Sequence, residues 1–447
     1  MAGVDRPATP LAHWWQRFDD PLMVALIDDA LRVNTTVRGA RAALARSRAA
    51  LDVQSAALLP ALRGSASAQR NRTGDLTGNA FRVGFDASWE LAVFGGQQAA
   101  VMAAEAEARA SSASLADVQV SVAAEVAVNA LHWRGLRARL ALARASLAAQ
   151  EETLQLTQWR QQAGLLSEIE VNQARTGTEQ TRAQLPSLLT SISESESSLA
   201  VLTGRDPAAM HDRLAAAIAS TASVSSPQPT PPADLVLAFP VDALRQRPDV
   251  RAAEALLIAA GARMAQADAA RWPRFELGGT LGLGARTVGA LTNGTSAAAA
   301  LLASLSASIF DGGAARAQVR VQQAALEQAA ASYDAALLAA LKDVEDSLAA
   351  LRNDRDRLQS LRDAAMAARS ASELAAERFR SGLIDFQVVL DTQRTDLSTQ
   401  DAVASALATL NADHVRLYKA LGGGWEASSV TGLAGTGQGT SLKPRIP

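Results

Sequence analysis

The residues able to do chemistry are few in this chain and lie far apart in it. Its 447 residues include no cysteine, which excludes disulfides, thiolate metal sites and a cysteine nucleophile. None of the histidines has a second His or a Cys at metal-ligand spacing; they are His13, His132, His211 and His414. No nucleophile, base and orienting group can be assembled, and Gly312-Gly313 lacks the Lys and Ser or Thr of a phosphate-binding loop. We therefore expect no enzyme, no catalytic residue, no metal and no cofactor.

Carboxylates follow two glycine turns, at Gly164 and Gly382. The acidic residues concerned are Glu168, Glu170, Asp385 and Asp391. Copies of such carboxylates around one symmetry axis would form rings, which attract cations and repel anions. Arg394 follows Asp391 by three residues, a spacing at which two helical side chains can pair.

Composition narrows the class of protein. Apolar residues make up 48% of the chain and charged residues 20%, with a formal net charge of -2, so no basic surface argues for nucleic acid. The apolar content is largely Ala and Leu, which favours helix. No stretch reaches the roughly 18 continuous apolar residues of a transmembrane helix, so any membrane-spanning part is expected to be β. Residues 1–10 lack the apolar core of a secretory signal.

The chain contains the same order of landmarks twice. Forty residues separate Gly164 from Gly204, and forty separate Gly382 from Gly422. The Phe-Gly-Gly at 94–96 similarly corresponds to Phe-Asp-Gly-Gly at 310–313. Such repetition predicts tandem structural repeats, with a first repeat at 1–222, a linker at 223–238, a second repeat at 239–424 and a disordered tail at 425–447.

Each repeat contains a segment of alternating polarity. Odd-numbered residues from Phe81 to Leu91 are apolar and the even-numbered ones mostly polar, which predicts a strand with two unlike faces. We expect β-hairpins at about 62–91 and 275–309, with loops at 73–79 and 287–296. Strands of about 10 residues can cross a bilayer, although alternation alone fits a soluble sandwich equally well. The polar faces include Arg82, Asp86, Glu90 and Glu276.

After each pair of glycines the period becomes helical. Apolar residues such as Leu337, Leu341, Val344, Leu348 and Leu351 recur at steps of four and three, as in coiled coils. We expect long helices at about 97–162 and 314–380, helices at about 168–203 and 385–421, and a helix opening each repeat. A rod of some 65 residues is roughly 100 Å long. The helices alone would also suit a spectrin-like scaffold.

The hairpins and the long helices together exclude both a helical scaffold and a soluble sandwich. A scaffold needs no hairpins with apolar faces, and a sandwich needs no helices of this length. Four strands cannot close a barrel, and open edges in lipid leave backbone groups unpaired. Three chains would supply 12 strands and begin to leave a lumen. We therefore predict a mainly α protein with a transmembrane β part, in which a trimer forms a 12-stranded barrel and an α-helical tunnel.

The chain resembles the TolC-type outer-membrane efflux proteins, in the branch that serves resistance-nodulation-division pumps. The resemblance extends from Trp14 to Trp425. The motifs that carry it are Trp14-Trp15, Phe18-Asp19-Asp20-Pro21, Arg247-Pro248-Asp249-Val250, Ala253-Glu254, Phe310-Asp311-Gly312-Gly313, Arg378-Phe379-Arg380-Ser381-Gly382 and Leu390-Asp391-Thr392-Gln393-Arg394.

The resemblance implies a homotrimer in the outer membrane of a Gram-negative bacterium, in contact with outer-membrane lipid. Its helical tunnel would cross the periplasm to an adaptor protein and an inner-membrane pump, and transport through it would be passive. The adaptor is expected to dock in grooves between Gly164 and Gly382. A helical scaffold or an adaptor is the alternative, although we find no lipoyl-like segment that an adaptor would add.

The resemblance also implies that acidic residues line the narrow periplasmic aperture, with Glu170 and Asp391 at matching positions of the two repeats. The chain departs from well-known members in the links that close this aperture. Ile384 stands where those members have Arg, and Phe379 where they have Tyr, so the same closing bonds cannot form.

Overall fold

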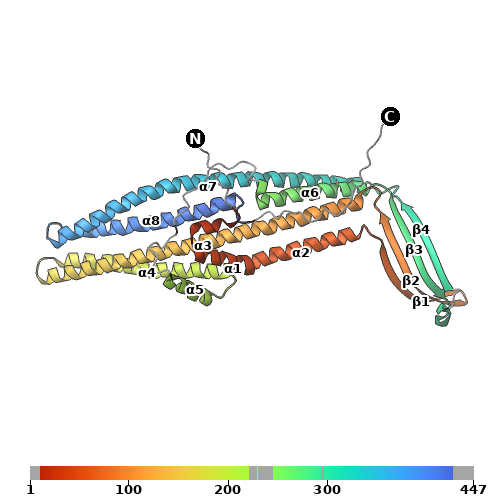
Figure 1. Cartoon of the computed structure of the whole chain (residues 1–447), viewed down its shortest axis with the longest axis horizontal. Helices are drawn as coiled ribbons and strands as arrows, with labels where there is room; N and C mark the ends of the chain where they lie inside the picture. Colours follow the sequence, from red (N-terminus) through yellow and green to blue (C-terminus); the bar gives the residue numbers. More distant parts are fainter. Residues whose placement is uncertain (1–10, 221–228, 230–244, 293–295, 426–447) are drawn as a thin grey trace, which may run out of the picture.

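The molecule is an elongated bundle of helices with a β-sheet at one end (Figure 1). The computed structural model describes residues 11–220, 229, 245–292 and 296–425. Apart from Pro229, the predicted linker at 223–238 lies outside the described residues, as does the predicted tail beyond Trp425.

Two long helices dominate the bundle. α3 and α7 have 67 residues each, and α4 and α8 have 35 each. At 1.5 Å per residue the longer pair measures about 100 Å. The helices are η1 Leu11–Phe18, α1 Pro21–Val33, α2 Thr35–Ala56, α3 Gly96–Gln162, α4 Glu168–Leu202, α5 Pro207–Ser220, α6 Pro248–Ala269, η3 Val288–Thr292, α7 Ala314–Arg380 and α8 Phe386–Ala420.

Small apolar side chains let these helices approach closely. Many buried residues of α3 are alanines, and α3 packs against α2, α4, α6 and α8. An 18-residue window of α3 is apolar enough to cross a membrane by length and composition, but half of it is buried inside the fold, as in a core helix. In α7 the predicted stripe of apolar residues is wrong at Leu341, which is 40% exposed. Ala340 is buried in its place, because it packs against Val250 of α6.

The strands form one antiparallel sheet in the order β1-β2-β3-β4. Pairing of β2 with β3 joins the two hairpins into a continuous layer. The strands are β1 Ala61–Thr73, β2 Leu76–Leu91, β3 Arg274–Ala285 and β4 Ala297–Ser306.

The predicted loop at 73–79 is wrong, because Thr73 pairs with Leu76 and only Gly74 and Asp75 form the turn. Gly74 has φ 63°, which a tight hairpin turn requires and glycine adopts without strain. The hairpin therefore extends further than its polar composition suggested, and β1 and β2 have 13 and 16 residues. At the other hairpin β4 ends at Ser306, so Ala307 and Ile309 lie beyond the strand predicted to contain them.

The first motif of the chain anchors its N-terminal part in the middle of the bundle. Asp20 accepts hydrogen bonds from the backbone N–H groups of Leu22 and Met23 at 3.1 and 3.2 Å, capping α1. The same carboxylate forms a bidentate pair with Arg134 of α3 at 2.5 and 2.7 Å. Trp14 stacks on Tyr418 of α8 with ring centroids 5.4 Å apart.

Arg247 has the equivalent role at the start of the second repeat. Its buried guanidinium donates to Asp249 at 2.7 Å, to Asp343 of α7 at 3.0 Å and to the carbonyl oxygen of Ala420 at 2.9 Å. Although burial opposes its charge, these carboxylates raise the pKa of Arg247. The motif therefore fastens α6 to α7 and to the end of α8.

Candidate functional site

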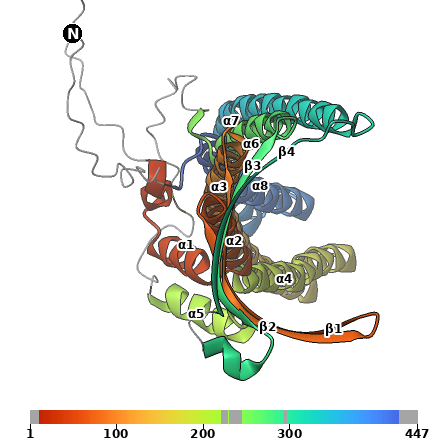
Figure 2. The same cartoon turned by 90° about the vertical axis from the view of Figure 1, so that its right-hand side faces the viewer.

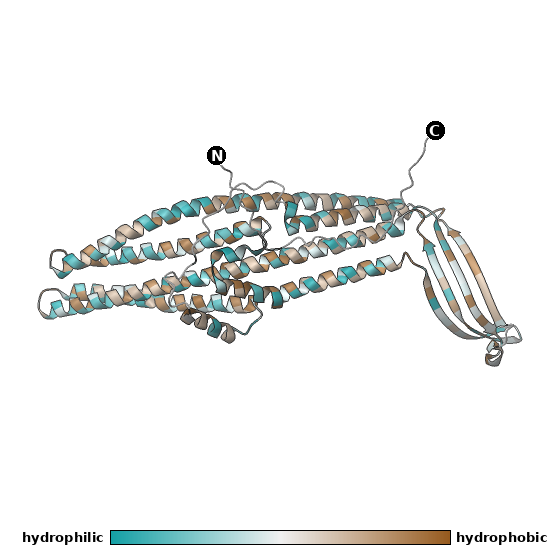
Figure 3. Cartoon of the chain, in the orientation of Figure 1, coloured by the Kyte–Doolittle hydropathy of each residue, from teal (hydrophilic) through white to brown (hydrophobic). Residues whose placement is uncertain are grey.

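Strand register divides the sheet into two unlike faces. The apolar face, as we call it, carries the odd-numbered residues of β2, β3 and β4 and the even-numbered residues of β1. Its central rows pair Phe85 with Leu281 and Val83 with Leu283, and all four side chains are at least 38% exposed. Figure 3 shows β4 coloured hydrophobic along much of its length. Among the described residues, nothing outside the strands covers these central rows.

The opposite, polar face brings together the four residues predicted to line a lumen: Arg82, Asp86, Glu90 and Glu276. Glu90 and Glu276 lie directly opposite each other across β2 and β3. Asp86 lies opposite Arg63 of β1 and accepts a hydrogen bond from the Ser65 hydroxyl at 2.7 Å. The row of Glu90 and Glu276 continues to Ser304 of β4, whereas the row of Arg63, Asp86 and Thr280 ends at Ala300.

Two glycines allow neighbouring strands to approach closely on the polar face. Gly84 pairs with Gly282, and a Cβ added to Gly84 would lie 2.8 Å from the Cα atom of Gly282. No side chain fits at such a separation. The sheet is a curved layer, with α4 and α8 on its concave side and α1 and α5 on its convex side (Figure 2).

The turns at Gly164 and Gly382 lie at the end of the molecule opposite the sheet (Figure 1). Their φ angles are 75° and 73°, the left-handed conformation that closes a helix. In each turn the following leucine donates its N–H to the helix: Leu165 to the carbonyl oxygen of Arg160 and Leu383 to that of Arg378, both at 2.9 Å. Leu165 and Leu383 are 72% and 73% exposed, so each turn presents an apolar side chain to solvent.

Glu170 has a local structural role beside the first turn. Its carboxylate accepts hydrogen bonds from the backbone N–H of Ser167 at 2.8 Å and from the Ser167 hydroxyl, and the Ser167 hydroxyl oxygen accepts one from Ile169 N–H at 3.2 Å. This reciprocal arrangement is a capping box, and the Ser167 hydroxyl lowers the pKa of Glu170.

The expected match between Glu170 and Asp391 is wrong. α4 and α8 have the same length and begin after Ser167 and Asp385, respectively. Counted from these caps, Glu170 corresponds to Val388, and Asp391 corresponds to Gln173. The turn glycines give the same correspondence, because Glu170 follows Gly164 by six residues and Val388 follows Gly382 by six, whereas Asp391 follows Gly382 by nine.

The other acidic candidates lie on exposed surface near the tip. Glu168 is in the first turn of α4, where a negative charge is favourable, and Asp385 is the N-cap residue of α8. Asp391 accepts a hydrogen bond from the Gln387 amide at 3.1 Å. Its predicted pairing with Arg394 does not form among the described contacts. Arg394 instead lines a groove between the helices.

Arg160 near the end of α3 was missed by the sequence analysis. Its guanidinium donates to the carbonyl oxygens of Phe379 at 2.9 Å and Arg380 at 2.7 Å, and lies 4.5 Å from the centroid of the Phe379 ring. Phe379 is buried against Phe386, and Ile384 packs on the same cluster. The two residues that replace the usual Tyr and Arg therefore form an apolar core inside the tip.

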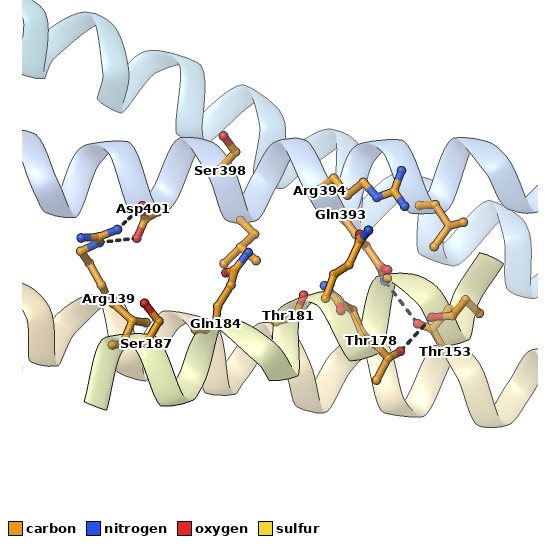
Figure 4. A pocket seen from close by; sticks show the side chains of 18 residues that line it. Arg139, Thr153, Thr178, Thr181, Gln184, Ser187, Gln393, Arg394, Ser398 and Asp401 are labelled. Atoms are coloured by element: carbon orange, nitrogen blue, oxygen red, sulfur yellow. Dashed lines mark hydrogen bonds and ion pairs between the residues drawn. The ribbon is translucent and has the colours of Figure 1, made fainter. Parts of the chain in front are cut away.

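Two grooves run along the helices above this core. One has a volume of about 440 Å³ and lies between α3, α4 and α8, with Thr178, Thr181, Gln184, Ser187 and Ser398 in its lining (Figure 4). A bidentate pair between Arg139 and Asp401, at 2.6 and 3.0 Å, joins α3 to α8 at one end of the drawn site. The other groove, of about 460 Å³, lies between α3, α7 and α8. Gln393 lines both grooves and donates to Thr153 at 3.2 Å.

Two buried titratable groups adjoin each other on α8. Burial and the neighbouring Asp354 carboxyl raise the pKa of Asp413 to about 6, although Arg416 opposes the shift. Burial, aided by the charge of Arg355, lowers the pKa of His414 to about 4. No group of three or more potential metal ligands occurs in the described part of the chain.

Comparison with known proteins places these features among outer-membrane channels. Residues 26–205 and 239–423 match the family described as outer membrane efflux protein. The chain is 30% identical to the toluene efflux pump outer membrane protein TtgF of Pseudomonas putida, over 95% of this chain and 88% of TtgF. It is also 30% identical to the pyoverdine export outer membrane protein OpmQ of P. putida, over 95% of this chain and 90% of OpmQ. The solved outer-membrane channel OprN matches with TM-score 0.83 and 31% identity, over 93% of each chain.

Proposed function

The chain belongs to the outer membrane efflux protein family, and from that premise we propose that it forms the trimeric conduit of a tripartite efflux system. The protein is an outer-membrane component of an efflux pump. One observation carries the proposed mechanism: a four-stranded sheet with an exposed apolar face stands at the end of helical hairpins about 100 Å long. This combination suits a membrane barrel continued by a tunnel.

The subunit number follows from the free edges of the sheet. β1 and β4 are its outer strands, and each has one row of backbone N–H and C=O groups without a strand partner among the described residues. Lipid cannot satisfy those groups, so β1 of one protomer would pair with β4 of the next. Three protomers give 12 strands, the smallest such closure with room for a lumen.

The equal lengths of the paired helices support an internal duplication. Each repeat would supply one hairpin to the barrel and one helical pair to the tunnel, so a trimer would have six similar units around its axis. The apolar face would contact lipid, and the polar face would line water. Arg82, Asp86, Glu90 and Glu276 would then face the lumen.

We assign closure of the periplasmic end to the tip of the helical bundle, which contains the turns at Gly164 and Gly382. Arg160 ties α3 to the last carbonyls of α7, where a cation is favourable, and Phe379, Phe386 and Ile384 keep the tip packed. Opening would require this intramolecular link to loosen. Glu168, Asp385 and Asp391 would place carboxylates near the aperture and favour cations there, whereas Glu170 would chiefly stabilise α4.

The grooves beside the tip are suited to docking of an adaptor. Both have polar linings that include Gln, Thr and Ser, and the groove between α3, α7 and α8 reaches Arg380, three residues before the exposed Leu383. An adaptor hairpin placed there would reach the inner-membrane pump. Cross-linking should join the adaptor to residues that line these grooves beside the turns at Gly164 and Gly382. Cross-links confined to the region of Pro229 would contradict this assignment.

Transport through the conduit would be passive, with no enzymatic step and no cofactor. The names of relatives that are equally similar to this chain mention toluene and pyoverdine, two unlike compounds. We infer that the pump selects the substrate and that the tunnel passes what the pump delivers.

Reconstitution of the purified full chain tests the proposal. The protein should form a trimer with heat-modifiable mobility on a gel, and its insertion into a planar bilayer should produce discrete conductance steps. A stable monomer without conductance would contradict the proposed channel and would favour a scaffold.

A further inference from the structure

Two arginines stand out on the apolar face of the sheet. Among the described strand residues, Arg70 and Arg72 of β1 are the charged side chains of that face, and both are exposed. We propose that they bind the phosphate groups of the phosphorylated glycolipid in the outer leaflet of the membrane. This proposal rests on the barrel described above.

The register places both arginines just beyond the apolar band. Ala68 and Phe81 form the last apolar pair of β1 and β2 on this face, after which Arg70 pairs with Asn79 and Arg72 with Thr77. The apolar side chains thus stop at the same level on both strands. A charge on the lipid-facing side is tolerated near the interface and costly at the middle of the bilayer, so Arg70 and Arg72 mark the interface.

The opposite end of the apolar face has a different composition. Phe94 stacks on Trp272 with centroids 5.5 Å apart and lies 6.3 Å from Phe275, close to the start of α3. Aromatic rings are enriched where a membrane meets water. Arginines replace such rings at the end of β1 remote from the helices, and this asymmetry matches a bilayer whose outer leaflet is strongly anionic.

The guanidinium groups remain available for a ligand. Arg72 donates to the carbonyl oxygen of Gly74 at 3.2 Å through Nε, which leaves its terminal nitrogens free to turn outward. Its nearest carboxylate, on Asp75, is 3.9 Å away and fully exposed, so this pair contributes little. Arg70 has no hydrogen bond or ion pair among the described contacts. Two guanidinium groups on alternate residues can each bind phosphate through two parallel N–H bonds.

Lipid binding by the purified trimer tests the site. Bisphosphorylated lipid A and chemically dephosphorylated lipid A are added to the full-length protein and bound lipid is measured by native mass spectrometry. Wild type should prefer the phosphorylated lipid by about tenfold or more, as loss of charge-assisted hydrogen bonds implies. The variant R70Q/R72Q should lose the preference, and R70K/R72K should keep part of it.

The matched control is R63Q/R82Q, which removes the same charges from β1 and β2 on the polar face. It should retain the lipid preference. Equal binding of the two lipids by wild type, or an equal loss in R63Q/R82Q, would overturn the proposal. Displacement of bound lipid A by millimolar inorganic phosphate would also overturn it, because the site would then recognise free phosphate. Conductance and heat-modifiable mobility of the same samples show separately whether the channel itself has formed.

Discussion

Arg160 and Phe379 link the two helical hairpins at the tip, through a hydrogen bond of 2.9 Å and a ring contact at 4.5 Å. The residues are 219 positions apart. This contact occupies the place where relatives are expected to use an Arg and a Tyr, yet here the Arg comes from α3 and the ring is buried. If this contact closes the aperture, as we propose, the closing interaction has a different donor and a different acceptor.

Arg160→Ala should loosen the tip. The substitution removes two hydrogen bonds to backbone carbonyls and one cation–π contact, together on the order of 1–3 kcal/mol in this half-buried setting. We expect a higher open probability in planar bilayers and greater entry of large antibiotics into cells that carry the variant. Arg175→Ala, which removes an exposed arginine of α4 near the same end, should leave both unchanged. Unchanged gating in the Arg160 variant would assign closure to other contacts.

The facing carboxylates Glu90 and Glu276 should favour cations in the barrel. In a trimer they would form a ring of six, and like charges directly opposite each other on a sheet are unfavourable without a counter-ion. The variant E90Q/E276Q should shift the reversal potential toward zero in a salt gradient. Asp75→Asn, at the tip of the β1–β2 turn, serves as the control and should cause little shift. A reversal potential independent of both glutamates would place selectivity at the helical tip.

The close approach of Gly84 and Gly282 should be essential for the curvature of the sheet. Gly84→Ala would put Cβ 2.8 Å from backbone atoms of β3, a contact that must push the strands apart at a cost of about 1–3 kcal/mol. We expect less heat-resistant trimer on gels. Gly78→Ala is the matched control, because nothing lies within 4 Å of its added Cβ on the same strand. Equal trimer yields from both variants would show that the close approach is not required.

Periodicity predicted the sheet and the long helices for a physical reason. Alternation over Phe81 to Leu91 allows one strand geometry with two faces, and the register then places Arg82, Asp86, Glu90 and Glu276 together. Long runs without proline likewise permit continuous helices. The ends of the strands were harder to predict, because the two-residue turn at Gly74 and Asp75 is flanked by polar residues that suit either a loop or a strand.

The tip was less predictable than the sheet. Arg160 binds backbone carbonyls, which leave no complementary residue type in the sequence, so no local signal identifies its partner. Glu170 carried a signal that could have been used: Ser167 followed three residues later by Glu is the pattern of a capping box. That pattern would also have fixed the start of α4, and counting from Gly164 and Gly382 would have prevented the false match with Asp391.

Asp413 and His414 should give opposite contributions to the pH dependence of stability. The pKa of Asp413 is about 6 in the folded protein against an ordinary value of 3.8. The folded state therefore gains protons first as pH falls, and this group adds stability between about pH 6 and 4. The pKa of His414 is about 4 against 6.5. Here the unfolded chain gains the proton first, so this group removes stability between about pH 6.5 and 4.

Single variants should separate the two contributions. Asp413→Asn removes the stability that protonation of Asp413 adds as pH falls, so the Tm of this variant should fall more than that of wild type between pH 7 and pH 5. His414→Gln removes the stability loss that His414 causes as pH falls, so the Tm of this variant should fall less than that of wild type over the same range. Comparing each variant with itself at the two pH values cancels the packing defect that either substitution causes at a buried position. If both variants shift in the same direction, the two groups do not titrate independently, and Asp354 and Arg355 would have to be included in one coupled network.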